Sequence, residues 1–163
     1  MGLGAANGVP EGPLVSFGLT GALRDDLPVG TVLDATRVVD ADGAELWSGE
    51  GLGVDGARAG TILAAEAIVD DPDERRRLHE RTGADAADLE SGPLARSGRL
   101  RGVVRAVSDT PAHPLNGLVG GVTPDGGYNW PGLLRAFTRS PRGFVRSASD
   151  ARRALDRLAR SWM

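Results

Sequence analysis

The sequence contains neither cysteine nor lysine, and each absence excludes a class of chemistry. Without cysteine there is no disulfide, no thiolate metal ligand and no cysteine nucleophile. All 19 basic residues are arginine, which excludes a lysine Schiff base and a phosphate loop that depends on lysine. No stretch approaches the roughly 18 apolar residues of a membrane-spanning helix, and the N-terminus lacks the basic and apolar segments of a signal peptide. We therefore expect a cytoplasmic protein.

Aromatic residues and net charge are also low. Aromatic side chains make up 4% of the chain and the net charge is −3, so the sequence does not predict a nucleic-acid partner. Two histidines far apart in the sequence, His79 and His113, do not predict a metal site. What remains is the composition of an ordinary soluble protein, without repeats or a low-complexity linker. Its 163 residues predict one domain spanning residues 1–163.

Short apolar runs alternate with helix signals along the chain. The first half predicts a strand at 14–17, a glycine turn at 18–21, and two strands joined by a tight turn at Asp42-Gly43. A strand at 60–69 precedes a helix that begins after the capping residue Asp71 and ends at Gly83. A strand (84–89), a short helix (92–97) and a strong strand (100–107) follow. This order predicts a three-layer α/β domain, in which helices flank a mixed, largely parallel twisted sheet.

The strand–helix–strand unit at 84–107 carries the strongest candidate site. A right-handed crossover would make its two strands parallel, so Glu90 and Asp109 would lie at the same, carboxyl edge of the sheet. Glu90 would also lie at a helix N-terminus, whose dipole favours its negative charge. Asp88 alternates with Glu90 along the strand and could be a solvated edge acid. The alternative interpretation is that these acids only cap a helix or close a turn.

Two further residues belong to this candidate site. Arg105 lies inside a strand of valines, and a buried guanidinium needs a carboxylate partner, which the same sheet edge supplies. His113 follows in a loop flanked by prolines and could line the pocket.

Two glycine-containing patterns favour simpler interpretations. "GLGVDG" at 51–56 fits a dinucleotide-binding pattern, but Glu50 and Asp55 would repel a pyrophosphate and no clear helix follows. "DADG" at 40–43 is a fragment of a calcium loop without the other ligands, so a hairpin turn is the better interpretation.

Two short motifs resemble a known family. "ADLES" (87–91) followed by "RAVSD" (105–109) looks like the paired signature of the nucleoside phosphorylase and nucleosidase superfamily. "LVSFGLTGALRDDLPVGTVLDAT" (14–36) is similar to the glycine turn of that superfamily and the segment after it. "TPDGGYNWPGLLRAFTRSP" (123–141) resembles the carboxyl end of the hopanoid-associated phosphorylases, which act on adenosylhopane.

The resemblance implies a role for each matching residue. Glu90 would accept hydrogen bonds from the ribose 2′ and 3′ hydroxyls, and Leu89 would replace a methionine that packs on the sugar. Asp109 would be the general acid at N7 of the leaving purine, positioned by Ser108 and Arg105. The residues that we expect to line the substrate pocket are Phe17, Gly18, Thr20, Gly21, Ile68, Asp88, Leu89, Glu90 and His113. Ile68 matches the position where many relatives place an aromatic residue.

The resemblance starts at residue 14, without a counterpart of the family's opening strand, so we expect an N-terminally truncated member. It implies cleavage of the N-glycosidic bond of an adenine nucleoside, without a cofactor but with phosphate as a possible co-substrate. A non-catalytic protein that binds a nucleoside, or a pocket reused for a non-nucleoside substrate, is the alternative. We also expect a homo-oligomer, most simply a dimer, because relatives assemble and an open sheet edge favours pairing.

The C-terminal segment, 135–163, is basic. Eight arginines lie between Arg135 and Arg160 against two acids, although the whole chain is acidic. The pattern predicts two helices separated at Ser140-Pro141, with Asn129 and Ser149 as caps. Ala151, Leu155, Leu158 and Trp162 would form one apolar stripe. The stripe predicts packing on the sheet, and the arginines favour, as an alternative, peripheral contact with an anionic membrane.

Overall fold

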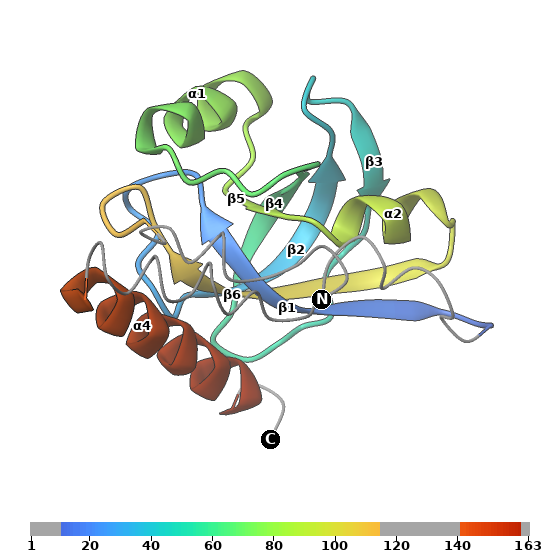
Figure 1. The fold of residues 1–163 in the computed structure, drawn as a ribbon. Helices are drawn as coiled ribbons and strands as arrows, with labels where there is room; N and C mark the ends of the chain where they lie inside the picture. Colours follow the sequence, from blue (N-terminus) through green and yellow to red (C-terminus); the bar gives the residue numbers. More distant parts are fainter. Residues whose placement is uncertain (1–10, 115–140, 161–163) are drawn as a thin grey trace.

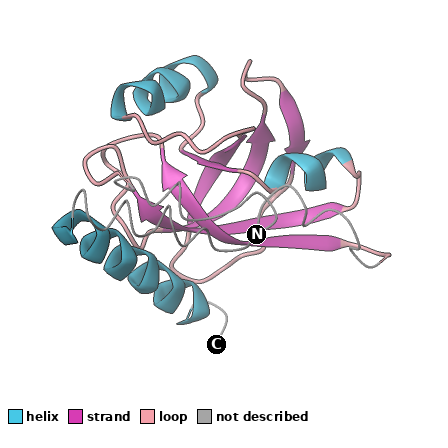
Figure 2. Ribbon diagram, in the orientation of Figure 1, coloured by secondary structure: helices cyan, strands magenta, loops and turns pink. Residues whose placement is uncertain are grey.

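The computed structural model describes residues 11–114 and 141–160 (Figure 1). In chain order its elements are β1 (Leu14–Ala22), β2 (Val32–Val39), β3 (Glu45–Ser48), β4 (Arg58–Ala64), α1 (Pro72–Thr82), β5 (Ala86–Asp88), α2 (Ser91–Arg96), β6 (Leu100–Asp109) and α4 (Pro141–Arg160). The helices α1 and α2 lie on one side of the strands and α4 lies on the other (Figures 1 and 2). The predicted α/β class, a mixed sheet flanked by helices, is confirmed.

The described strands form a sheet that closes on itself. Its order is β3-β2-β4-β5-β1-β6, and β2 also pairs with β6. β2 achieves this by using different stretches: residues 32–35 pair with β6, and residues 37–39 pair with β3. Parallel and antiparallel pairings are equally frequent among these strands. Closure pairs both edges of every described strand except β3.

The prediction that the two strands of the 84–107 unit run parallel is wrong. β5 pairs with β4 and β1, and β1 lies between β5 and β6. Because β1 is antiparallel to β5 but parallel to β6, the two strands of the unit run in opposite directions. Their carboxyl ends therefore point in opposite directions. β5 nevertheless lies beside the same end of β1 as Asp109, because Gly21 pairs with both Ala87 and Asp109.

The local signals of the sequence are realised in α1 and in the β2–β3 hairpin. The Asp71 carboxylate accepts a hydrogen bond from the Glu74 amide at 2.8 Å, and Gly83 ends α1 at φ 70°. Asp40 accepts from the amides of Asp42 and Ala44 within the hairpin turn, at 3.0 and 2.9 Å. In both places a short carboxylate satisfies backbone donors that would otherwise lack a partner.

The predicted glycine turn at 18–21 is a strand instead. Residues 14–22 form β1 continuously, and its pairing with β6 runs from Leu14 to Gly21. Closely spaced glycines are typical of turns, which is why the sequence predicts one there. The tertiary structure uses Gly18 and Gly21 as strand positions without a side chain, beside two buried arginines.

Helix α4 packs against the outer side of the closed sheet. Ala154 and Leu158 are fully buried against Val104 and Ala106 of β6, which confirms that the C-terminal helix packs on the sheet. α4 begins at Pro141, in agreement with the predicted break, but it continues through Ser149, which is therefore not a cap. The side chains of Ala151 and Leu155, together with Asn129, Trp162 and the first predicted helix, lie outside the described residues.

Within the residues that the structure describes, no helix combines the length and the apolar character needed to cross a membrane.

Candidate functional site

Arg105 of β6 is the centre of a buried polar cluster. Its Nε donates to Asp88 Oδ2 at 2.5 Å, and its Nη2 donates to Ser16 Oγ at 2.6 Å and to Ser91 Oγ at 3.2 Å. The guanidinium is 1% exposed, so these bonds replace its water shell. The predicted need of Arg105 for a carboxylate partner is confirmed, and that partner is Asp88.

Asp88 is not the solvated edge acid that its alternation with Glu90 suggested. It is 6% exposed and pairs with Arg105. Its Oδ1 accepts from the Ser91 and Glu90 amides at 2.8 and 3.1 Å, and its Oδ2 accepts from Ser91 Oγ at 2.5 Å. Asp88 therefore satisfies the free amides at the start of α2, which is the capping role of the alternative interpretation.

Glu90 keeps its carboxylate available. It occupies the N-cap position of α2, but its side chain makes no capping bond there. Its Oε2 lies 3.7 Å from Arg105 Nη2, and the side chain is 25% exposed. Burial raises the pKa of Glu90, the neighbouring Asp88 raises it further, and Arg105 opposes both effects. A carboxylate fixed beside a buried ion pair, with part of its surface open, is suited to accept hydrogen bonds from a ligand's hydroxyls.

Asp109, at the end of β6, belongs to a second buried cluster. It is 4% exposed and forms an ion pair with Arg75 Nη2 of α1. Ser108 Oγ donates to Asp109 Oδ1 at 2.6 Å. Burial raises the pKa of the Asp109 carboxyl, and Arg75 and Ser108 partly offset that rise. The arrangement holds a carboxyl group that takes up a proton more readily than an ordinary aspartate.

Arg75 is a further buried residue of this cluster, and it was not among the predicted site residues. The side chain is 1% exposed, and besides Asp109 it donates to the carbonyl oxygens of Val69 and Ala22, at 2.8 and 3.2 Å. The signal was nevertheless present. Arg75 lies three residues before Leu78 and seven before Thr82, which are the other buried residues of α1, so it shares their helix face.

Two glycines of β1 make room for the two clusters. Gly18 pairs with Arg105 and Gly21 pairs with Asp109. A Cβ atom added at Gly21 would lie 2.8 Å from Asp109 Oδ2, whereas one at Gly18 would lie 3.5 Å from Arg105 Nη1. The two glycines lie three positions apart in β1, about 10 Å at ordinary strand rise.

A register shift in the β1–β6 pairing sets the position of Asp109. Thr20 pairs with Val107 but Gly21 pairs with Asp109, so Ser108 is the extra residue of a bulge. With regular pairing Asp109 would lie opposite Ala22. Bulges of this kind re-aim a side chain, and this one brings Asp109 opposite Gly21, where the missing side chain leaves space for it.

Three further residues of the predicted pocket lie at different places around the two clusters. Phe17 alternates with Ser16 and Gly18, so it points to the opposite side of β1, where it is 44% exposed. Thr20 is buried: its hydroxyl donates to the Ala87 carbonyl of β5 at 2.8 Å, and its own carbonyl oxygen accepts from Ser108 Oγ at 3.2 Å. Leu89 is half-buried between Asp88 and Glu90.

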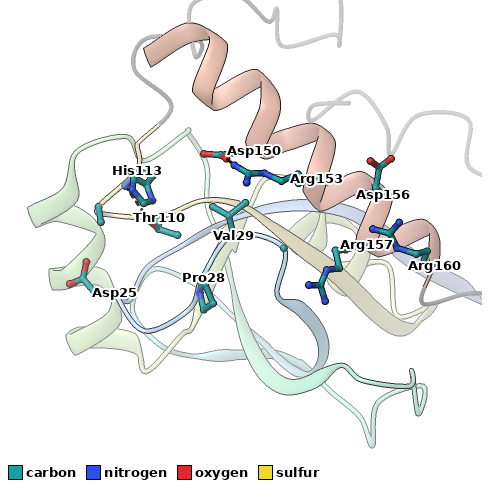
Figure 3. Close-up of a pocket in the computed structure, with 12 residues that line it drawn as sticks. Asp25, Pro28, Val29, Thr110, His113, Asp150, Arg153, Asp156, Arg157 and Arg160 are labelled. Atoms are coloured by element: carbon teal, nitrogen blue, oxygen red, sulfur yellow. Dashed lines mark hydrogen bonds and ion pairs between the residues drawn. The ribbon is translucent and has the colours of Figure 1, made fainter. Parts of the chain in front are cut away.

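Ile68 and His113 lie on segments outside the sheet. Ile68 follows β4 and is 41% exposed, next to Val69, whose carbonyl oxygen accepts from Arg75. His113 lines a different cleft, beside α4 (Figure 3), and its backbone pairs with Thr110.

Two amides of the glycine-rich segment at 51–56 are occupied by the protein itself. The buried Asp34 carboxylate accepts from the amides of Leu52, at 2.9 and 2.8 Å, and Val54, at 3.1 Å. The segment is a loop folded onto an aspartate. Across residues 11–114 and 141–160, no three histidine, aspartate or glutamate side chains are grouped to hold a metal ion.

No model of a protein family matches the chain, and no curated protein matches its sequence. Solved structures do share its fold. The 5′-methylthioadenosine/S-adenosylhomocysteine nucleosidase of S. pneumoniae, with a transition-state inhibitor, aligns with a TM-score of 0.52 at 16% identity. That alignment covers 90% of this chain and 70% of the nucleosidase. The corresponding nucleosidase of Campylobacter jejuni aligns at 0.51 and 16% identity, over 89% and 68% of the two chains.

A futalosine hydrolase mutant of Helicobacter pylori aligns with a TM-score of 0.51 at 18% identity, over 65% of this chain. This chain spans 62% of the length of that hydrolase. At these identities the likeness shows a common fold, that of enzymes named as nucleosidases and a futalosine hydrolase.

Proposed function

We propose that this protein cleaves the N-glycosidic bond of an adenine nucleoside, with Glu90 holding the ribose and Asp109 activating the purine. The observation that carries the proposal is the position of two acids around strand β1: Glu90 lies 3.7 Å from Arg105, the partner of Gly18, and Asp109, whose pKa is raised, lies opposite Gly21. Sugar and base of a nucleoside each need a separate polar partner, and the two clusters supply one each. The fold shared with nucleosidases supports the same conclusion.

Glu90 is the ribose partner in this proposal. Its carboxylate can accept two hydrogen bonds from vicinal hydroxyls, because both oxygens are acceptors and the side chain is not used as a cap. The cluster of Arg105, Asp88 and Ser91 fixes the start of α2 and with it the position of Glu90. Arg105 and Asp88 are positioning residues here.

Asp109 is the general acid. As the bond between C1′ and N9 breaks, the electron pair of that bond moves into the purine, and N7 takes the proton of the Asp109 carboxyl. Water then bonds to C1′ and loses one proton to solvent, which gives hydrolysis, or phosphate bonds to C1′ as co-substrate, which gives phosphorolysis. Asp109 regains its proton from solvent. The raised pKa of Asp109 favours this role, because the carboxyl must carry a proton before the bond breaks.

The ion pair with Arg75 favours a second candidate function. Arg75 occupies Asp109 Oδ2, and Ser108 occupies Oδ1. Turnover therefore requires Arg75 to move away from Asp109 when a base enters. If Arg75 stays, the protein binds a nucleoside through Glu90 without cleaving it.

The test is incubation with adenosine, 5′-methylthioadenosine and a long-chain adenosyl compound, with and without phosphate, followed by measurement of free adenine. Asp109→Asn should lower adenine release by about 10²–10⁴-fold, the usual contribution of a general acid. Glu90→Gln should weaken the binding of ribosides more than that of free adenine. Asp55→Asn, at an exposed loop position, is the matched control and should keep full activity.

The outcomes separate the two functions. Equal activity of the wild type and Asp109→Asn contradicts the general-acid role. Riboside binding that depends on Glu90, without any adenine release, supports the binding function. Ser108→Ala serves as a second variant if Asp109→Asn fails to fold, because it removes only one hydrogen bond to the carboxyl.

The long-chain adenosyl compound tests whether the substrate resembles adenosylhopane, as the resemblance to hopanoid-associated phosphorylases implies. That substrate remains a prediction. The homo-oligomer also remains a prediction, and light scattering coupled to size-exclusion chromatography tests it.

A further inference from the structure

A cleft of about 620 Å³ lies between helix α4 and the loops that follow β1 and β6 (Figure 3). Glu90, Arg105 and Asp109 do not line it, so it is separate from the site of the proposed nucleoside chemistry. Its volume falls within the range of small-molecule sites, roughly 300–1,000 Å³. The cleft is large enough for a metabolite of moderate size.

One wall of the cleft is a row of arginines on α4. Arg153, Arg157 and Arg160 follow one another at spacings of four and three residues, which places them on one face of the helix. The opposite wall includes Thr110 and His113.

Two of the acids in the cleft are already neutralised. Asp150 is buried and forms an ion pair with Arg153. Asp25 accepts two hydrogen bonds from Arg76 of α1, at 2.9 and 3.3 Å. Because Asp150 and Asp25 already have arginine partners, they do not pair with Arg157 or Arg160.

Arg157 and Arg160 are the remaining cations of the cleft. Figure 3 draws an ion pair between Asp150 and Arg153, and none of the ion pairs among the described residues includes Arg157 or Arg160. The stem of Arg157 lies against Gly30, where an added Cβ would be 3.6 Å from its Cγ. The remaining acid, Asp156, extends upward from α4 in Figure 3, whereas Arg157 extends downward from the helix.

We propose that this cleft binds a small phosphate monoester, whose phosphate group is held by Arg157 and Arg160. A guanidinium presents donors in a planar fork that matches phosphate oxygens, and two adjacent guanidiniums match a dianion. Thr110 and His113 supply polar groups on the other wall for the rest of the ligand. The proposal does not rest on nucleoside cleavage.

A phosphate group can reach the cleft on a free metabolite or on a lipid head group. Insertion of α4 into a bilayer does not fit the packing, because Ala154 and Leu158 of its apolar face are buried against β6. A lipid head group could reach only the arginine face of α4. Arg157 and Arg160 would therefore bind the phosphate group of a metabolite or of a lipid.

The test measures binding of inorganic phosphate and glycerol 3-phosphate by calorimetry, with glycerol as the neutral counterpart. A parallel arm measures co-sedimentation with vesicles of phosphatidylcholine, with and without phosphatidic acid, at low and high salt. The variant is Arg157→Gln/Arg160→Gln. The control, Arg101→Gln/Arg152→Gln, removes two exposed arginines that do not line the cleft.

We expect the wild type to bind glycerol 3-phosphate but not glycerol, and the cleft variant to lose affinity at least tenfold while the control keeps it. Asp109→Asn should also keep it, which separates this result from the nucleoside test. Binding only to vesicles with phosphatidic acid, lost in the cleft variant, would assign the phosphate to a lipid. Equal losses in the cleft variant and the control, or no binding to either phosphate source, would overturn the proposal.

Discussion

Arg75 of helix α1 and Asp109 of strand β6 form a buried ion pair across 34 residues of sequence. The pair links the helix to the end of the strand that carries the proposed general acid. The other donors of Arg75 bond to the carbonyl oxygens of Val69 and Ala22, so one side chain connects three segments of the fold. Asp109 can therefore protonate a ligand only if the Arg75 guanidinium moves away from it.

Removal of Arg75 should destabilise the protein strongly. Arg75→Met leaves the Asp109 carboxylate buried without its cation, and we expect the free energy of unfolding to fall by about 3–5 kcal/mol in urea denaturation. Arg75→Met/Asp109→Leu should recover most of that loss, because no buried charge is left. Arg77→Met, at an exposed position of the same helix, should change stability little. A double variant as unstable as Arg75→Met would contradict the role of the ion pair.

Gly21→Ala and Gly18→Ala should differ, although both replace a glycine of β1. A Cβ at position 21 would lie 2.8 Å from Asp109 Oδ2, so it must displace the carboxylate, at a cost of about 1–3 kcal/mol. At position 18 the nearest atom, Arg105 Nη1, is 3.5 Å away, an ordinary contact. Gly18→Ala should be neutral or stabilising by up to about 1 kcal/mol. Thermal unfolding of both variants is the measurement, and equal effects would exclude the space-filling explanation.

The stability of Glu90→Gln relative to the wild type should depend on pH. The folded protein raises the pKa of Glu90, so its folded state holds the proton more tightly than the unfolded chain does. The wild type therefore gains stability from Glu90 as pH falls, and loses that gain as pH rises through the folded pKa. Glu90→Gln has no such dependence at this position, so its stability relative to the wild type should be greatest near pH 7 and smallest near pH 4. Denaturation curves at both values test this, and a difference that grows toward acid pH would contradict it.

Arg105→Lys should not substitute for arginine. The guanidinium contacts Asp88, Ser16 and Ser91 at once, and a single ammonium cannot reproduce that geometry. Each charged hydrogen bond lost in the interior costs about 1.5–3 kcal/mol, so a loss of at least that size is expected in urea denaturation. Arg101→Lys, at an exposed position of the same strand, is the control. Wild-type stability of Arg105→Lys would show that the cluster contributes little.

The local elements of the fold could be predicted because their signals are local. The cap at Asp71, the stop at Gly83 and the turn at Asp42-Gly43 depend on hydrogen bonds and backbone angles within a few residues. The need of Arg105 for a carboxylate could also be read from the sequence, since a guanidinium among valines must be paired when it is buried.

The composition and the order of apolar segments thus determined the α/β class, the capped helix and the acidic residues of the candidate site. Only the tertiary structure decided which strands are neighbours, because strand pairing depends on contacts between distant segments. In that structure β1 lies between β5 and β6, and the segment predicted as a glycine turn is part of a strand. Asp109 forms an ion pair with Arg75. The physical reason is that a buried charge pairs with an opposite charge that the packed fold brings close to it. The distance between two side chains far apart in the chain cannot be read from local sequence patterns.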